Sequence, residues 1–477
     1  MKNRLLFFAL LVLTSFSLAQ MPWSAPAPLT DTTANNLQPA FVKDINEYSN
    51  VFNMLLWQRD FGDRSRIFFK SFENTQIEIP LSADLPGVYA TNPSAAMVFN
   101  YPHPDYVLIV WQSNQNGNED LYSVVYRDGQ FDPVIQVTTG ASDDIHPNVR
   151  KNYLVWEREG KILFSEYSST DSTWSDEIVL DSLNAGRPVV GFYSDYEPLA
   201  AYEKDSLIYL KERFTGQGWQ PSQAIASSGE NRLPQLVPGW HFSILWQRRQ
   251  NAQEDWDIMS YDPLWHTTGN LNFGPGNETN VQGVEFLWIT QRDFEPPTLI
   301  AFESDVNGDG EIYANELLYG SLVNVSQYPG VDSLPALSDF SYAEGQTRQF
   351  RVWCAWQKFL DGKWQVWGSF TETDWGLGIP PGEEISSFKL FQNYPNPFNP
   401  ETTVEFYLPH AAGVQLEIFN LLGQKVRTLA AERKIAGLHQ VQWDGRDEAG
   451  REVSGGVYFL RLQAGNSVQT RKMLLIR

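Results

Sequence analysis

Cysteine is almost absent from this chain of 477 residues, which contains Cys354 alone. An internal disulfide and a zinc site built from several cysteines are therefore excluded. Basic residues are also few: 35 lysines and arginines stand against 57 aspartates and glutamates, for a net charge of −22. That charge argues against nucleic acid or an anionic membrane surface as a partner. The sequence also lacks the signatures of zinc peptidases, serine hydrolases and phosphate- or dinucleotide-binding loops.

Aromatic residues, in contrast, are abundant. They make up 14% of the chain, which excludes a disordered protein, and 34 glycines and 28 prolines accompany them. This composition is typical of many short strands joined by tight turns. The length corresponds to about three domains of ordinary size, so the core needs no disulfide or metal to stabilise it.

The N-terminus has the parts of a signal peptide. Lys2 and Arg4 form a basic start, residues 5–16 form an apolar run, and the segment ending at Ala19 supplies the small residues that signal peptidase requires. We expect residues 1–19 to be removed. A membrane anchor is the alternative, but the run is too short for a hydrocarbon core of about 30 Å, and no later stretch is long enough. The mature protein is therefore expected to be a bacterial exoprotein without a transmembrane segment, secreted or held at the outer cell surface.

Charge divides the chain into two parts. Residues 388–477 hold 11 basic and 8 acidic side chains, a net of +3, so the remainder carries −25. A Gly- and Pro-rich stretch at 376–384 separates the parts and can neither continue a strand nor start a helix. We predict a large acidic domain at residues 20–376, a linker at 377–392 and a small domain at 393–477.

One pattern recurs seven times in the large domain. A strand ends in an aromatic residue followed by Gln or Glu, and successive aromatics are 44 to 56 residues apart. The seven pairs are Trp57-Gln58, Trp111-Gln112, Trp156-Glu157, Tyr202-Glu203, Trp246-Gln247, Phe302-Glu303 and Trp356-Gln357. Another strand opens upstream of each pair, with a proline in six units and with Val281 in the sixth unit of the series. The prolines are Pro39, Pro93, Pro147, Pro188, Pro234 and Pro335.

Short antiparallel strands that recur at this period are typical of the blades of a β-propeller, in which each blade buries its faces against its neighbours. Seven units predict an all-β fold with a seven-bladed propeller over residues 20–376. A series of β-sandwiches, or a six-bladed ring with an extra hairpin, is the alternative. The repeats resemble WD40-like and TolB-like propellers, which implies a fold and not a function.

The last unit has no fourth strand of its own before the linker. In other units the fourth strand begins 14 to 16 residues ahead of the next proline, and residues 23–30 have this spacing from Pro39. We predict that residues 23–30 form the outer strand of the seventh blade and join the two ends of the ring. The prolines within them are tolerated there because an outer strand has one unpaired edge.

The small domain alternates apolar and polar residues along six or seven segments, which predicts an antiparallel Ig-like β-sandwich. Five motifs follow one another in it: NYPNPFNP at 393–400, NLLGQ at 420–424, WDG at 443–445, SGGVY at 454–458 and KMLL at 472–475. In this order they resemble the C-terminal sorting domain of the bacterial type IX secretion system.

The segment beginning with WDG is also similar to the Ig-like domain of flagellar hook-capping proteins. The resemblance covers about a fifth of the chain. It implies a cargo protein carried across the outer membrane, whose last domain is read by the secretion translocon and then removed or used for surface attachment. A purely structural Ig module is the alternative.

One metal motif is present. Asp305, Asn307, Asp309 and Glu316 fit the spacing of the EF-hand loop, whose oxygen ligands bind calcium. The repeat instead places this segment in a hairpin between two strands, where Glu316 would lie far along a strand. Calcium is one prediction for this loop, and a solvated turn rich in Asp and Asn is the other. No other cofactor is predicted.

Candidate binding residues lie in the loops ahead of the strand-opening prolines, which would meet around the centre of a propeller on the face where ligands usually bind. These candidates are Asp144, His146, Arg187, Arg232 and Asp332. Turn formation alone is the alternative explanation, since Asp, Asn and Gly favour turns in any case.

The function predicted from these features is that of a non-enzymatic exported protein. Its propeller would bind an extracellular protein or glycan, and its C-terminal domain would direct secretion through the translocon. No catalytic residue is predicted. The alternative is a secreted hydrolase that acts on polysaccharide or peptide, which requires two carboxylates about 5–9 Å apart in a cleft.

Overall fold

The computed structural model describes a large part of the chain between Trp23 and Leu475. The described ranges are 23–43, 54–72, 77–99, 105–192, 197–237, 243–263, 266–271, 273–285, 298–316, 322–327, 330–339, 341–342, 350–373, 389–390, 393, 398, 400–408, 412–421, 423–434, 437–464 and 467–475. The predicted signal peptide and most of the predicted linker lie outside these residues.

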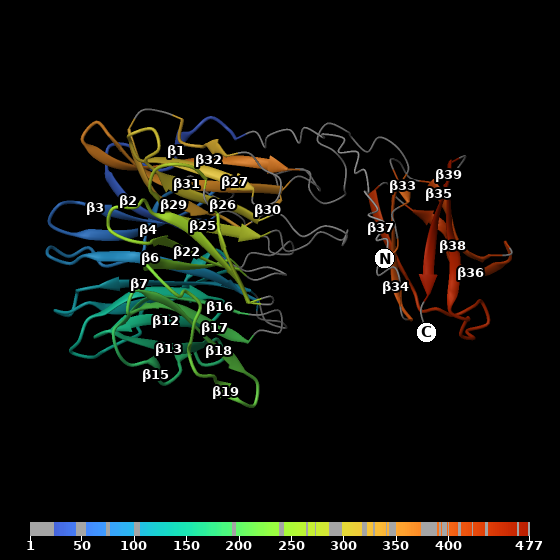
Figure 1. Ribbon diagram of the computed structural model, residues 1–477, viewed down its shortest axis with the longest axis horizontal. Helices are drawn as coiled ribbons and strands as arrows, with labels where there is room; N and C mark the ends of the chain where they lie inside the picture. Colours follow the sequence, from blue (N-terminus) through green and yellow to red (C-terminus); the bar gives the residue numbers. More distant parts are fainter. Residues whose placement is uncertain are drawn as a thin grey trace, which may run out of the picture. The chain divides into compact units, whose positions relative to one another are not determined.

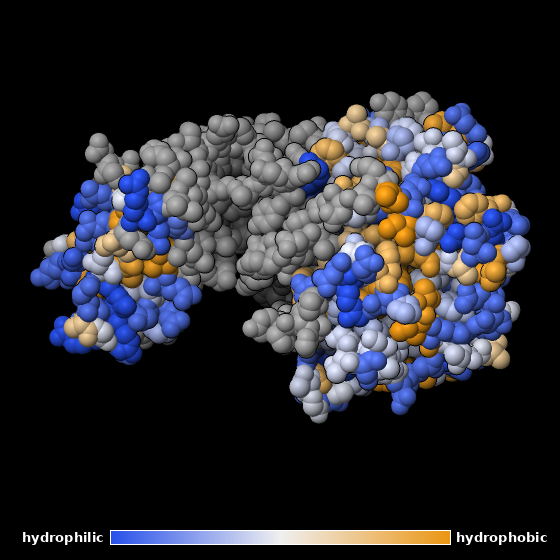
Figure 2. All heavy atoms as spheres, turned by 180° about the vertical axis from the view of Figure 1, so that it is seen from behind, coloured by the Kyte–Doolittle hydropathy of each residue, from blue (hydrophilic) through white to orange (hydrophobic). Residues whose placement is uncertain are grey.

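Every regular element among the described residues is a β-strand, which confirms the all-β fold class. The chain divides into two compact units, one holding β1–β32 and the other β33–β39. On the side shown in Figure 2, the described surface is mainly hydrophilic, and hydrophobic residues of the large unit gather in a band.

In its described residues, the large unit has seven antiparallel sheets of four or five strands. The first sheet consists of β2 (Asn35–Phe41), β3 (Met54–Asp60), β4 (Ser65–Ser71) and β5 (Ile79–Pro80), the second of β6 (Ala90–Val98), β7 (Tyr106–Ser113), β8 (Asp120–Arg127), β9 (Gln130–Phe131) and β10 (Ile135–Gln136), and the third of β11 (Asp144–Arg150), β12 (Tyr153–Arg158), β13 (Lys161–Ser168), β14 (Thr173–Trp174) and β15 (Ile178–Asp181). In each of these sheets the first three strands are hydrogen-bonded neighbours in chain order, and in the second and third sheets the last two short strands both pair with the third strand.

The next three sheets repeat this plan. The fourth sheet consists of β16 (Ala185–Phe192), β17 (Pro198–Lys204), β18 (Leu207–Phe214), β19 (Gly218–Trp219) and β20 (Gln223–Ala224), the fifth of β21 (Glu230–Val237), β22 (Ser243–Arg249), β23 (Asp257–Asp262) and β24 (Thr267–Asn270), and the sixth of β25 (Glu278–Glu285), β26 (Thr298–Ser304), β27 (Glu311–Glu316) and β28 (Val323–Asn324).

The seventh sheet differs because it takes a strand from the other end of the chain. It consists of β29 (Val331–Leu337), β30 (Ser341–Tyr342), β31 (Phe350–Leu360), β32 (Lys363–Thr373) and β1 (Ala27–Pro28). Figure 1 shows β1 beside β32, and Ala27 pairs with Gly368 in an antiparallel register. The prediction that the N-terminal segment supplies the outer strand of the seventh sheet is confirmed.

Contacts on both sides of β1 extend this pairing. The backbone N–H of Ser24 donates to Phe370 O at 2.8 Å, and the N–H of Leu29 donates to Val366 O at 2.8 Å. Leu29 is also buried in a cluster with Trp57 of the first sheet and other residues of the seventh. The first and last sheets therefore share one hydrophobic core.

The repeated aromatic residues lie in the second strand of each sheet. All seven are at most 2% exposed, and they join clusters of buried residues that draw on adjacent sheets. Burial of these large side chains between sheets supplies much of the stability of the large unit, since apolar burial scales with area.

The small unit has two sheets around one core. One sheet has the order β33 (Lys389–Leu390), β34 (Thr402–Leu408), β37 (Gly437–Trp443), and the other has the order β36 (Lys425–Lys434), β35 (Ala412–Asn420), β38 (Gly456–Ala464), β39 (Ser467–Leu475). Phe406 from the first and Leu416 and Leu460 from the second are fully buried in a single cluster. The predicted β-sandwich is confirmed.

One boundary of the small unit needs correction. β33 lies within residues 377–392, which were predicted to be linker, yet Leu390 is fully buried and pairs with Phe406. The apolar Leu390 can bury its side chain against the sandwich, so the folded unit begins before residue 393.

Candidate functional site

A cavity of about 510 Å³ lies among the first strands of the seven sheets of the large unit. All seven of these strands contribute to its lining: β2, β6, β11, β16, β21, β25 and β29. We call this space the inner-strand cavity.

Each first strand carries a β-bulge at the same place in the repeat. The residue ahead of the repeated proline, or ahead of Val281, has a φ between 47° and 54°, and the pairing with the second strand shifts register there. The seven bulge residues are Gln38, Asn92, His146, Arg187, Leu233, Asn280 and Leu334, and all of them line the cavity. Proline fits beside them because it lacks an N–H, and within the described residues each of these strands lies at one edge of its sheet.

Except in the first sheet, where Gln38 Oε1 accepts the Asn92 N–H instead (2.9 Å), the Gln or Glu that follows the repeated aromatic links one sheet to the next. Its side chain accepts a hydrogen bond from the backbone N–H of the bulge residue in the following sheet. Such bonds join Gln112 to His146 (3.0 Å), Glu157 to Arg187 (3.1 Å), Glu203 to Leu233 (2.8 Å), Gln247 to Asn280 (3.1 Å) and Gln357 to Gln38 (3.2 Å). The last bond connects the seventh sheet to the first. The two parts of the repeated pattern, the Gln or Glu after the aromatic and the residue ahead of the proline, thus form one contact.

His146 and Arg187 of the third and fourth sheets line the cavity, and each contacts a glutamate outside the lining. His146 Nδ1 lies 3.0 Å from Glu157 Oε2, the same oxygen that accepts the Arg187 N–H. Arg187 Nε lies 4.0 Å from Glu203 Oε1. We call these four residues the charged arc.

The two carboxylates of the charged arc differ in acidity. Burial works against ionisation of Glu157, but hydrogen bonds from His146 and from the Arg187 N–H outweigh it and leave the pKa of Glu157 below its ordinary value. Burial dominates at Glu203 and raises its pKa, despite the Leu233 N–H and the charge of Arg187. An ionised and a more weakly acidic carboxyl group thus stand in neighbouring sheets.

Of the predicted binding residues, His146 and Arg187 lie in this arc. Arg232 does not line the cavity; its side chain is 54% exposed, pairs with Glu230 and lies 5.7 Å from the centre of the Trp256 ring. Asp144 and Asp332 are fully buried and do not line the cavity either.

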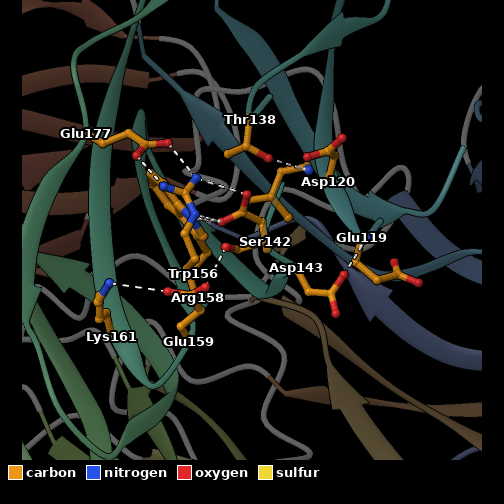
Figure 3. A network of polar contacts seen from close by, with 12 residues as sticks. Glu119, Asp120, Thr138, Ser142, Asp143, Trp156, Arg158, Glu159, Lys161 and Glu177 are labelled. Atoms are coloured by element: carbon orange, nitrogen blue, oxygen red, sulfur yellow. Dashed lines mark hydrogen bonds and ion pairs between the residues drawn. The ribbon is translucent and has the colours of Figure 1, made fainter. Parts of the chain in front are cut away.

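Asp144 and Asp332 instead accept hydrogen bonds from buried tryptophans. Trp156 Nε1 donates to Asp144 at 2.7 Å, and Trp356 Nε1 donates to Asp332 at 2.9 Å. Arg158 forms an ion pair with Asp144. Arg158 also forms an ion pair with Glu177, as Figure 3 shows. These aspartates satisfy the indole N–H groups of the repeat, so their position is explained by structure.

The same arrangement recurs with asparagine in two other sheets and fails in the sixth. Asn36 accepts from Trp57 at 2.9 Å, and Asn231 accepts from Trp246 at 2.8 Å. In the sixth sheet the repeated aromatic is Phe302, which has no N–H, and Glu278 stands two residues ahead of the bulge. Glu278 is 2% exposed, its Oε2 has no hydrogen-bond partner within the described residues, and burial raises its pKa to about 7.

We expect Glu278→Gln to stabilise the protein at high pH. The folded-state pKa of about 7 lies above the ordinary value of 4.5, so the folded state binds more protons between these values, and its stability falls as pH rises through this window. The variant should match the native chain below the window and exceed it by about 2–3 kcal/mol at pH 8. Urea unfolding at pH 4.5, 6 and 8 measures this. A gain that is equal at all three pH values would contradict the assignment, and the surface variant Glu159→Gln should give none.

The predicted calcium ligands do not form one group. Asp305 accepts hydrogen bonds from the N–H and the side chain of Asn277, both at 2.7 Å, and Asn307 donates to Tyr313 at 2.6 Å. Glu316 pairs with Leu299 at the opposite end of the β26–β27 hairpin from the loop. Within the described residues, no three His, Cys, Asp or Glu side chains gather as a metal site.

Sequence reasoning did not select Glu157 and Glu203 as site residues, although it found both as members of the repeat. Their role depends on which sheet stands next to which, and only the spatial arrangement shows that. A signal was available: a polar residue at fixed spacing after a buried aromatic needs a hydrogen-bond partner.

Comparison with known proteins identifies the small unit. Residues 398–467 match the FlgD Ig-like domain family. The small unit is Ig-like. No curated protein matches the sequence. Among the described residues, none forms a helix with the length and apolar character needed to cross a membrane.

Several solved structures share features with the large unit at low identity. A protein of unknown function from Dyadobacter fermentans is 11% identical, with a TM-score of 0.44 over 74% of this chain and 98% of its own. Oligogalacturonate lyase in complex with manganese is 13% identical, with a TM-score of 0.46 over 74% and 94%. The β-propeller domain of the trilobed protease from Pyrococcus furiosus is 8% identical, with a TM-score of 0.43 over 71% and 97%. These values assign neither an activity nor a ligand.

Proposed function

We propose that the seven sheets are the blades of one seven-bladed β-propeller and that this propeller is a binding module with its site in the inner-strand cavity. One observation carries the proposal: bulge residues from all seven sheets line a single cavity. The hydrogen bond from Gln38 to Gln357 and the pairing of β1 with β32 favour a closed set of seven over six blades and a separate hairpin.

Binding is favoured over catalysis by the pattern of the repeat itself. Glu157 and Glu203 occupy positions that hold Gln112 and Gln247 in other sheets, and all four accept a backbone N–H. The fold therefore requires an acceptor there and not an acid.

The mature protein should bind a subset of a glycan and peptide array, with and without calcium. Absence of any ligand on the array would contradict a binding function.

A secreted hydrolase is the second candidate. It is favoured by the lowered pKa of Glu157 beside the raised pKa of Glu203, since such pairs suit a general base and a general acid. Hydrolysis of a polysaccharide or peptide that Glu203→Gln abolishes would establish it. The variant should fold, because glutamine accepts the same N–H in other sheets.

We further propose that the chain is exported and that its Ig-like unit directs this export through a type IX translocon. The motif order from residue 393 and the family match at 398–467 support a sorting role. Trp23 forms a β-bridge with Thr371 in the last sheet. Removal of residues 1–19 would leave Trp23 close to the new N-terminus, where it can pair in this way.

Deletion of residues 388–477 should stop secretion and leave the propeller folded. The two units have separate cores, so the large unit does not need the small one to bury its surface. In a bacterium with this secretion system, the truncated protein should accumulate in the periplasm with the melting temperature of the large unit unchanged. Normal amounts at the cell surface would remove the sorting role and leave a structural Ig module.

A further inference from the structure

His146 and Arg187 of the charged arc line the inner-strand cavity, and within the described residues the polar contacts of their side chains are with Glu157 and Glu203, respectively. We propose that they bind a hydroxylated carboxylate, such as a sugar acid, with Arg187 holding the carboxylate and His146 a neighbouring hydroxyl. This inference rests on the proposed binding function of the cavity and adds the chemical class of the ligand.

Arg187 has the properties of an anion-binding group. Its side chain is 51% exposed, its Nε lies 4.0 Å from Glu203 Oε1, and its charge also acts on Glu157. Its position at the bulge is fixed by the backbone N–H bond to Glu157 Oε2. The backbone at Arg187 is thus fixed, and a guanidinium can offer two parallel N–H donors to a carboxylate.

His146 presents its second ring nitrogen as an acceptor. Because Glu157 is ionised and can only accept, the bond at 3.0 Å requires His146 Nδ1 to donate. In the neutral imidazole the Nε2 atom then carries the lone pair and accepts a hydrogen bond, for which a ligand hydroxyl is a suitable donor.

Glu157 is a positioning residue that sets the spacing of these two groups. Its Oε2 accepts hydrogen bonds from both His146 Nδ1 and the Arg187 N–H. This shared acceptor fixes His146 and Arg187 of adjacent blades relative to each other. Gly186 permits this approach, since a Cβ there would lie 2.9 Å from Glu157 Oε2.

The surrounding charge favours one carboxylate over a dianion. The chain carries a net charge of −22, and Glu157 and Glu203 flank Arg187. A phosphate or sulfate cluster would meet repulsion from these groups, whereas a single carboxylate is balanced by one guanidinium. Bulge residues Gln38, Asn92 and Asn280 add amides to the same lining, which suit further hydroxyl groups.

The test uses isothermal titration of the mature chain with glucuronate, glucose and acetate. We expect glucuronate to bind at least about 10-fold more tightly than glucose, which lacks the carboxylate, or acetate, which lacks hydroxyls. Tighter binding of a glucuronate-terminated oligosaccharide would identify a glycan as the source of the group, and equal binding would identify the free acid.

The repeat supplies variants that should fold. Arg187→Leu introduces the residue that the fifth and seventh sheets have at this bulge, and His146→Asn introduces that of the second and sixth. We expect glucuronate affinity to fall about 10- to 100-fold for Arg187→Leu and about 3- to 10-fold for His146→Asn. The surface variant Lys161→Gln should bind as the native chain does.

The ligand class is wrong if glucuronate binds no better than glucose, or if Arg187→Leu leaves its affinity unchanged. A neutral glycan or a peptide that binds while glucuronate does not would overturn the ligand class and leave the binding function standing. Failure of both the titration and the array would overturn the two together.

Discussion

Removal of residues 20–31 from the mature chain should unfold the large unit as a whole and not fray one sheet. The segment places β1 on the edge of the last sheet, and Leu29 is buried between the last sheet and the first. Leu29 also accepts a hydrogen bond from Lys70 of the first sheet at 3.0 Å. The lost burial and hydrogen bonds are worth on the order of 5 kcal/mol, which is comparable to the total stability of many domains.

A point substitution isolates the same contact. A Cβ on Gly368 would lie 2.4 Å from Leu29 Cδ1, so Gly368→Val should displace β1 and lower the melting temperature of the large unit strongly. Gly140 is a matched control because its Cβ would meet no atom closer than 3.9 Å, and Gly140→Ala should have little effect. Calorimetry of the three proteins measures this. An unchanged melting temperature after deletion would show that the two ends are held together by other contacts.

The closure of the large unit could be predicted because it depends on spacing along the chain. A missing fourth strand at one end and a strand of the right offset at the other are both visible in the sequence. The repeated proline and the aromatic pair were visible too. The contact that they make together is a hydrogen bond from a bulge residue to the Gln or Glu of the preceding sheet. This contact was not visible in the sequence, because it joins residues of different repeats.

The candidate site was only partly predictable for a related reason. Asp144 and His146 stand two residues apart in one strand, yet the first is fully buried beneath Trp156 and the second lines the cavity. The bulge at His146 changes which side chains face the cavity, and the repeated proline beside it does not by itself reveal a bulge. The buried indole N–H groups offered a further clue, since each needs an acceptor.

The calcium motif shows the limit of spacing rules. The spacing of Asp305 and Glu316 fits an EF-hand loop, which lies between two helices. Here Glu316 lies on an extended strand, which advances about 3.3 Å per residue and places it far from the turn. A separation of eleven residues therefore brings two ligands together in a loop between helices and keeps them apart in a hairpin between strands.

Lys358 and Asp332 form a fully buried ion pair, and breaking it should be among the most costly single changes in the large unit. Their side chains are 1% and 0% exposed, and Lys358 Nζ lies 2.9 Å and 3.1 Å from the two carboxylate oxygens. Burial raises the pKa of Asp332 to about 6, against the opposing effects of Lys358 and the Trp356 N–H, so Asp332 is ionised at neutral pH.

Asp332→Asn keeps an acceptor for Trp356, as Asn36 and Asn231 do for their own tryptophans. It leaves the Lys358 ammonium buried without a counter-charge, and the expected loss is about 3–5 kcal/mol. Adding Lys358→Met removes that charge and should recover most of the loss, because methionine fills the space of the lysine stem. Denaturant unfolding of the native chain and the three variants completes a double-mutant cycle. If the double variant is as unstable as the sum of the single ones, the loss comes from packing around Trp356 and not from the stranded charge.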